Sequence, residues 1–288
     1  MERVLAGPVA IRLGRSRRTG QCLVLAYHNV VPARSPTGGD CSLHLDFDVF
    51  RRQLDALGNA RVGSLETALH AAPSDPVVAI TFDDAYASAV TLALPELAAR
   101  SLPSTMFVAP GLLDQGMPWW DRLAAAGAVA ETLRNRCLEE LGGETSRIES
   151  ELGSAMVDRR DPLLSIASAE QLRHAALLPG LTFGSHTWSH PNLRRQNEAR
   201  LDEELRRPLD WLRAGFPAIT RGWVAYPYGC FNAQVEEAAR AAGYEAGFAV
   251  TGGWFSRSDR PMALPRLNIP SGLSIDGFRA RIAGLLNL

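Results

Sequence analysis

Residues 77–85 read VVAITFDDA, an unbroken apolar run over 77–82 that is followed by two adjacent acids. Strands buried on both faces read as continuous apolar runs rather than alternating ones. Six further runs of this kind occur, at 22–27, 104–109, 181–185, 223–226, 246–250 and 264–269. Helical patterns separate the runs, so the chain is predicted to be an α/β protein with a mainly parallel sheet. Seven such strands are expected to curl into an incomplete (β/α) barrel.

The segments between the strands carry helical patterns. Apolar spacing predicts a helix over Phe47–Leu57, and a second, charged helix is predicted over Asn197–Ala214. Pro208 lies inside the second helix and is expected to kink or shorten it, because proline lacks a backbone N–H. Residues 121–165 contain no strand pattern and are predicted to be a helical insertion within one domain of residues 21–288.

The composition excludes several classes of function. The 288 residues include 31 acids and 30 bases, which gives a net charge of −1 and no positive field for binding nucleic acid. All the bases are arginine. The absence of lysine excludes Schiff-base and pyridoxal chemistry and a Walker A phosphate loop.

Cysteine spacing and hydropathy indicate the cellular compartment in which the protein is expected. The four cysteines are scattered without a C-x-x-C pair and are expected to be reduced thiols in a cytoplasmic protein. No apolar run reaches the roughly 18 residues of a membrane span, and no signal-peptide core is found. Residues 1–20 are a basic extension, predicted either to be solvated or to contact an anionic membrane surface.

Two adjacent carboxylates, Asp83 and Asp84, end the central run. Neighbouring carboxylates repel each other, so a compensating group is expected near them. A metal ion would bind one and leave the other free as a base. The alternative is a solvated turn in which aspartate acts as a turn former.

Two histidines follow the run at 181–185. His186 and His190 lie four residues apart and would converge on one metal ion if this stretch forms a helical turn. Histidines at the surface or in a cap are the alternative interpretation. Because an aspartate pair also ends a buried strand, one aspartate and two histidines would complete a three-ligand set with open positions.

A tight turn, YPYG at 226–229, ends another of the apolar runs. Backbone N–H groups in such a turn can face a developing oxyanion, although the same residues also occur in simple structural turns.

Together these segments resemble the polysaccharide deacetylases with NodB homology, carbohydrate esterase family 4. The T-F-D-D sequence at 81–84 is similar to the first motif of that family, and H-T-W-S-H at 186–190 is similar to the second. The Y-P-Y-G turn resembles the third motif of one branch. The resemblance extends over roughly residues 20–270.

The resemblance implies an incomplete barrel that holds one divalent metal ion. By position, the metal ligands would be Asp84, His186 and His190. Asp83 would be the general base that activates the metal-bound water, and the Tyr228 backbone N–H would help to hold the oxyanion. Zinc suits these donors, and cobalt or nickel would also fit.

Three positions depart from the family pattern. Ala225 replaces the arginine that orients the base, Ala85 replaces a glycine, and the last strand lacks the histidine that acts as general acid. An acid without a counter-charge in a desolvated pocket shifts toward its neutral form, so Arg266 in the last strand is expected to reach Asp83. His28 ends the first strand and is the candidate proton donor, with Asp83 itself as the alternative.

The implied function is hydrolysis of acetyl groups, N-acetyl in preference to O-acetyl, on a polysaccharide, oligosaccharide or glycoconjugate. The protein would then be a hydrolase that acts on carbon–nitrogen bonds other than peptide bonds. The motifs specify neither the glycan nor the oligomeric state. A catalytically inactive glycan-binding protein on the same fold and a metal hydrolase of a small non-sugar amide are the alternatives.

Overall fold

A curled parallel sheet forms the centre of the computed structural model, which describes residues 18, 20–33, 35, 38–70, 76–124, 127–157 and 160–286. Its strands are β1 (Cys22–Tyr27), β4 (Arg61–Val62), β5 (Val77–Phe82), β6 (Ser104–Val108), β7 (Leu181–Ser185), β8 (Thr220–Ala225), β9 (Ala246–Phe248) and β10 (Leu267–Asn268). Their order is β10-β1-β5-β6-β7-β8-β9, with β4 also paired to β5. A separate parallel pair joins β2 (Asn29–Val31) to β3 (His44–Asp46).

The sheet is an incomplete (β/α) barrel, which confirms the predicted fold class. All its strand pairs are parallel. Among the described residues, the edge strands β9 and β10 form no ladder with each other, and one isolated bridge joins Phe248 to Leu264 nearby. Tyr27 at the end of β1 lies opposite Phe82 at the end of β5. The residues that follow these strands therefore gather at one face of the barrel.

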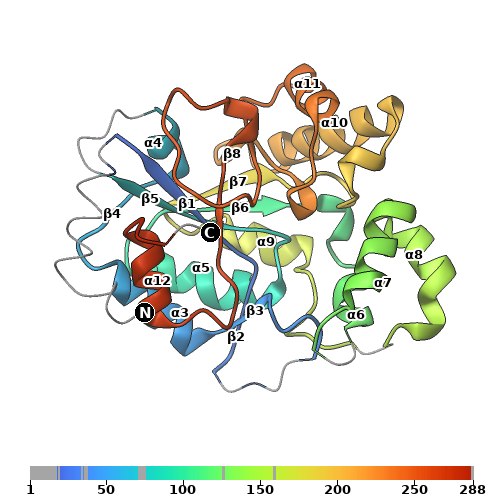
Figure 1. Cartoon of the computed structure of the whole chain (residues 1–288), viewed down its shortest axis with the longest axis horizontal. Coiled ribbons are helices and arrows are strands. Elements are labelled where there is room, and N and C mark those ends of the chain that lie inside the picture. Colours follow the sequence, from blue (N-terminus) through green and yellow to red (C-terminus); the bar gives the residue numbers. More distant parts are fainter. Residues whose placement is uncertain are drawn as a thin grey trace.

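Helices cover the outside of the sheet (Figure 1). The α-helices are α3 (Phe47–Leu57), α4 (Leu65–His70), α5 (Leu94–Ala99), α6 (Trp119–Leu123), α7 (Glu131–Asn135), α8 (Thr145–Leu152), α9 (Ala169–Ala175), α10 (Glu198–Gly215), α11 (Ala233–Ala241) and α12 (Ile275–Ile282). The 3₁₀ and π turns are η1 (Ala89–Ala93), η2 (Pro110–Leu112), η3 (Arg136–Glu140), η4 (Gly153–Ala155), η5 (Leu193–Arg195), η6 (Pro227–Gly229) and η7 (Pro261–Ala263). None of the described helices combines the length and the hydropathy of a membrane span.

Helix α3 has the predicted limits, and its caps explain them. The Asp46 side chain accepts hydrogen bonds from the N–H groups of Asp48 and Val49 at the start of the helix. Gly58 follows the last residue with a positive φ of 51°. The apolar face of the helix buries Phe50 and Leu54 against the sheet.

Pro208 does not shorten its helix, so the expected shortening is wrong. Helix α10 is 18 residues long and continues past Pro208 to Gly215. Proline removes one helical hydrogen bond, the one to the carbonyl of Glu204 four residues earlier. That carbonyl accepts instead from the backbone N–H of Trp188, at 3.1 Å. The lost bond is thus replaced from outside the helix, which offsets part of the energetic penalty of proline.

The last strand is shorter than the predicted run 264–269. Leu264 exchanges backbone hydrogen bonds with the β9 side, through Gly247 and Ala249. Leu267 instead pairs with Leu25 of β1. The run therefore changes partners between these two leucines, and only Leu267–Asn268 forms a ladder. Strand β8 also differs from its prediction, beginning at Thr220 and ending at Ala225.

Helices α7 and α8, with η3 and η4, fall within residues 121–165, and no strand lies in the described part of that segment. Figure 1 shows α6, α7 and α8 together at one side of the molecule. The four cysteines are free thiols. The basic extension of residues 1–20 lies outside the described residues, apart from Arg18 and Gly20.

Candidate metal centre and active site

The aspartate pair lies in a strained turn at the carboxyl end of β5. Asp84 and Ala85 have positive φ values of 67° and 61°, in the left-handed region. A residue with a Cβ loses roughly 1–2 kcal/mol in this conformation. This explains why glycine suits the position of Ala85. Asp83 is anchored by its backbone N–H, which donates to the Tyr27 carbonyl at 2.9 Å.

The histidine pair lies in a bent loop after β7, and the expected helical turn is absent. Thr187 and His190 both adopt positive φ, 66° and 61°. The Thr187 hydroxyl accepts a hydrogen bond from the His190 backbone N–H at 3.1 Å. The bend brings the Nε2 atoms of His186 and His190 within 3.1 Å of each other. The two rings thus converge through a loop rather than through helical spacing.

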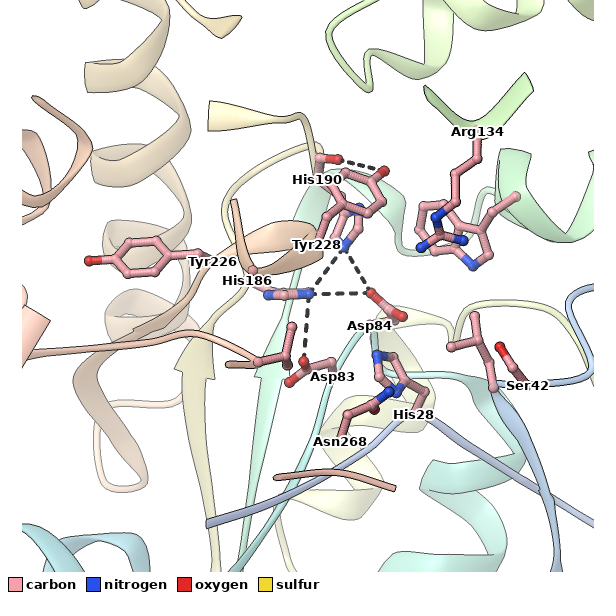
Figure 2. A pocket seen from close by; sticks show the side chains of 14 residues that line it. His28, Ser42, Asp83, Asp84, Arg134, His186, His190, Tyr226, Tyr228 and Asn268 are labelled. Atoms are coloured by element: carbon pink, nitrogen blue, oxygen red, sulfur yellow. Dashed lines mark hydrogen bonds and ion pairs between the residues drawn. The ribbon is translucent and has the colours of Figure 1, made fainter. Parts of the chain in front are cut away.

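Three donor atoms meet at one point (Figure 2). Asp84 Oδ1 lies 3.5 Å from His186 Nε2 and 3.2 Å from His190 Nε2. When two donor atoms each lie about 2.1 Å from one bound metal ion, they lie roughly 3.0–3.6 Å from each other. All three side chains are buried, and Asp84 Oδ1 has no hydrogen-bond donor. The spacing and the unsatisfied oxygen both fit a divalent ion.

Protonation states in the cluster also suit a metal. His186 Nδ1–H donates to the Ala225 carbonyl at 2.7 Å, which leaves the Nε2 lone pair directed into the site. Burial lowers the pKa of His186, and it lowers the pKa of His190 to about 3, so both rings are neutral at pH 7. Burial raises the pKa of Asp84, and the neighbouring Asp83 adds to this rise. A bound cation would offset that penalty.

Arg266 makes the expected contact with Asp83. Its Nη1 and Nη2 donate to Oδ1 and Oδ2 of Asp83, both at 2.7 Å, in a bidentate pair whose arginine is fully buried. Nη1 also donates to the Thr81 hydroxyl at 3.2 Å. Burial raises the pKa of Asp83, but the charge and the hydrogen bonds of Arg266 hold it well below the usual range. Asp83 is therefore ionised at neutral pH.

His28 and Tyr228 lie on the same pocket as the cluster. The pocket has a volume of about 240 Å³ and is lined by His28, Ser42, Leu43, Asp83, Asp84, Trp120, Arg134, His186, His190, Tyr226, Tyr228, Gly229, Val250 and Asn268. His28 is half-buried beside Asp84 (Figure 2), and burial lowers its pKa. Tyr228 has a positive φ of 58° in its turn, and its ring packs on His190 at a centroid distance of 4.6 Å.

Several pocket residues were not predicted from the sequence. Trp120 packs on the His190 ring, with the centroids 4.7 Å apart. Its indole N–H donates to the Tyr86 hydroxyl at 2.7 Å, and Tyr86 donates to Asp121 at 2.6 Å. Arg134, from α7, points toward the pocket (Figure 2). The only available signal in the sequence was the aromatic and acidic stretch around Trp120, because nothing in a single sequence places Arg134 of α7 at this pocket.

The fold is shared with solved structures, some of which are named as deacetylases. The Streptococcus pyogenes deacetylase PplD in complex with acetate is 20% identical, with a TM-score of 0.63, over 91% of this chain and 97% of that one. IcaB from Ammonifex degensii is 20% identical, with a TM-score of 0.63, over 92% and 97%. A de-N-acetylase from Aggregatibacter actinomycetemcomitans is 17% identical, with a TM-score of 0.64, over 92% and 100%.

Comparison of the sequence itself gives the family. No curated protein matches the chain significantly. The family model described as polysaccharide deacetylase matches residues 70–247, which is more than half of the chain and includes both the aspartate pair and the histidine pair. This chain belongs to the polysaccharide deacetylase family.

Proposed function

We propose that the protein is a metal-dependent hydrolase that removes acetyl groups, N-acetyl in preference to O-acetyl, from a polysaccharide, oligosaccharide or glycoconjugate. Family membership supports removal of an acetyl group from a carbohydrate. The observation that carries the metal dependence is the convergence of three buried donor atoms beside an ionised aspartate. The name of the Aggregatibacter relative, a de-N-acetylase, supports the preference for N-acetyl groups.

Asp84, His186 and His190 would hold one divalent ion. Zinc suits two imidazoles and one carboxylate, and cobalt or nickel would also fit. Such an ion, when bound, polarises a carbonyl oxygen and lowers the pKa of water. The neighbouring side chains supply the proton transfers and the orientation.

Asp83 is proposed as the general base that takes a proton from the attacking water. Its bidentate pairing with Arg266 fixes the carboxylate plane and keeps it ionised. This supports Arg266 as the residue that orients the base, in place of the family arginine whose position is Ala225 here. The backbone N–H of Tyr228, in a rigid turn at the pocket wall, is proposed to donate to the oxyanion.

His28 is proposed to return a proton to the leaving amine. It lines the pocket beside Asp84. Its lowered pKa limits the fraction that is protonated at neutral pH, so Asp83 is the alternative donor once it has taken the proton from water.

The direct test of the proposed function is acetate release from an N-acetylglucosamine oligomer and from an O-acetylated xylan oligomer. The purified protein is assayed as prepared, after chelation, and after zinc is restored. We expect acetate from the N-acetyl substrate, loss after chelation and recovery with zinc. Binding of the oligomer without turnover would instead favour an inactive glycan-binding protein. Turnover only of a small amide such as acetamide would favour a non-sugar amidase.

Arg266→Ala is expected to shift the acid limb of the pH–rate profile to higher pH. Arg266 lowers the pKa of Asp83, so its removal raises that pKa and leaves less ionised base at a given pH. Breaking this buried pair should also lower the free energy of unfolding by about 3–5 kcal/mol. Rates from pH 4 to 9 and urea unfolding measure the two effects. The exposed Arg257→Ala is the control, and an unchanged acid limb in Arg266→Ala would exclude the assigned role.

His28→Ala is expected to remove the basic limb of the pH–rate profile and to leave zinc content unchanged. A general acid works only while protonated, so a rate that depends on His28 falls as pH rises through its pKa. Because burial lowers that pKa, the fall should begin below about pH 6.5, the ordinary histidine value. The exposed His70→Ala is the control. If His28→Ala keeps the wild-type profile, Asp83 returns the proton.

A further inference from the structure

Glu204 is a fully buried carboxylate on α10, behind the loop that joins His186 to His190. Its Oε2 accepts hydrogen bonds from two loop amides, Trp188 N–H at 2.9 Å and Ser189 N–H at 2.8 Å. Its Oε1 accepts from the Ser189 hydroxyl at 2.7 Å. One carboxylate thus satisfies three loop donors.

Pro208 adds a further acceptor at the same place. It lies four residues after Glu204 and has no N–H to give to the Glu204 carbonyl. The carbonyl lies 3.1 Å from the Trp188 N–H, which it shares with the carboxylate. Pro208 therefore leaves the Glu204 carbonyl free to accept a hydrogen bond from the histidine loop.

The loop needs such support because its conformation is unfavourable by itself. Two of its residues, Thr187 and His190, have positive φ. On the opposite side, the Gly111 N–H donates to the Trp188 carbonyl at 2.8 Å, and a Cβ at Gly111 would lie 2.6 Å from that oxygen. The loop is thus held between η2 and α10. Without the acceptors on α10, the partly buried Trp188 and Ser189 amides would lose their partners.

We infer that Glu204, with Pro208, is a positioning residue for the metal centre. It holds the loop in the bend that places His190 Nε2 beside His186 Nε2 and Asp84 Oδ1. It contacts neither the metal position nor the pocket. This inference rests on the proposed metal-dependent function. A role limited to stabilising α10 is the competing explanation, because Glu204 also pairs with Arg200 of that helix at 2.9 Å.

The test is zinc affinity of metal-free protein, measured by equilibrium dialysis, in Glu204→Gln and in Glu203→Gln. An amide at position 204 has only one acceptor oxygen and presents an N–H₂ group to the loop donors. We expect Glu204→Gln to weaken zinc binding by about 10- to 100-fold, the usual effect of losing an outer contact of a metal site. Glu203 is the neighbouring, exposed glutamate, which pairs with Arg200 and Arg207. Its variant should bind zinc like the wild type.

Hydrogen exchange gives a second readout in the same metal-free proteins. The amides of residues 187–190 should exchange faster in Glu204→Gln than in Glu203→Gln. Excess zinc should restore most of kcat to Glu204→Gln, because the ligands themselves are intact. If Glu204→Gln has a lower Tm but normal zinc affinity and normal loop exchange, the positioning role is wrong.

Pro208→Ala keeps the inference testable if Glu204→Gln does not fold. Alanine restores a helical N–H that competes with Trp188 for the Glu204 carbonyl, and it also favours the helix. We expect unchanged or higher Tm together with weaker zinc binding. Zinc affinity equal to that of the wild type would contradict the inference. Failure of the wild type itself to bind zinc would overturn the proposed metal centre, and the inference with it.

Discussion

Asp83→Asn is expected to lower kcat by about 10²- to 10⁴-fold, the usual effect of losing a general base. An asparagine amide cannot accept the proton of the attacking water. Zinc content should remain at the wild-type level, because the three donor atoms belong to Asp84, His186 and His190. Steady-state rates and metal analysis of the same preparation measure both quantities.

The control for this variant is Asp84→Asn, which should lose zinc as well as activity. Asp83→Asn also leaves the buried Arg266 without its counter-charge, so its unfolding free energy should fall by about 3–5 kcal/mol. Assays must therefore be run well below its Tm. Near-normal kcat in zinc-loaded Asp83→Asn would show that another group is the base.

His186→Ala is expected to reduce zinc below one ion per chain and to reduce acetate release to the level of chelated protein. The substitution removes one of three donors, together with the Nδ1–H contact to the Ala225 carbonyl. Metal analysis after dialysis and the oligomer assay measure the result. The exposed His174→Ala should retain both zinc and activity. Full zinc occupancy in His186→Ala would refute the ligand assignment.

Zinc binding should also depend on pH in a defined direction. Histidine must be neutral to bind a metal, so protons compete as pH falls toward the histidine pKa. An ordinary histidine would place that loss near pH 6.5. Because burial lowers the pKa of His186 and of His190, we expect zinc affinity to persist below that value. Zinc occupancy measured between pH 4 and 8 tests this shift.

Sequence periodicity predicted most of the sheet because buried parallel strands have unbroken apolar runs. Strands β1, β5 and β7 have their predicted limits. The contact between Arg266 and Asp83 was predictable for a related reason. A buried acid needs a cation, and the last predicted run, 264–269, contains an arginine long enough to reach Asp83. In the structure Arg266 directly precedes β10 rather than following it.

The predictions that were wrong concern features that depend on contacts between distant segments, and no local sequence pattern indicates such contacts. The bend at His186–His190 is set by positive φ values and by acceptors on α10, and so the helical spacing of the histidines was misleading. Glu204 appears in the sequence as one acid among many on a charged helix. Pro208 appears as a helix breaker until the Trp188 N–H that replaces its missing donor is seen.

The most direct test of the account is a zinc titration of metal-free protein, followed by acetate release from the N-acetylglucosamine oligomer. The account predicts no turnover without metal, a linear rise in rate with added zinc, and saturation at one ion per chain. Full turnover by the metal-free protein, or saturation at a stoichiometry that His186→Ala does not change, would contradict it.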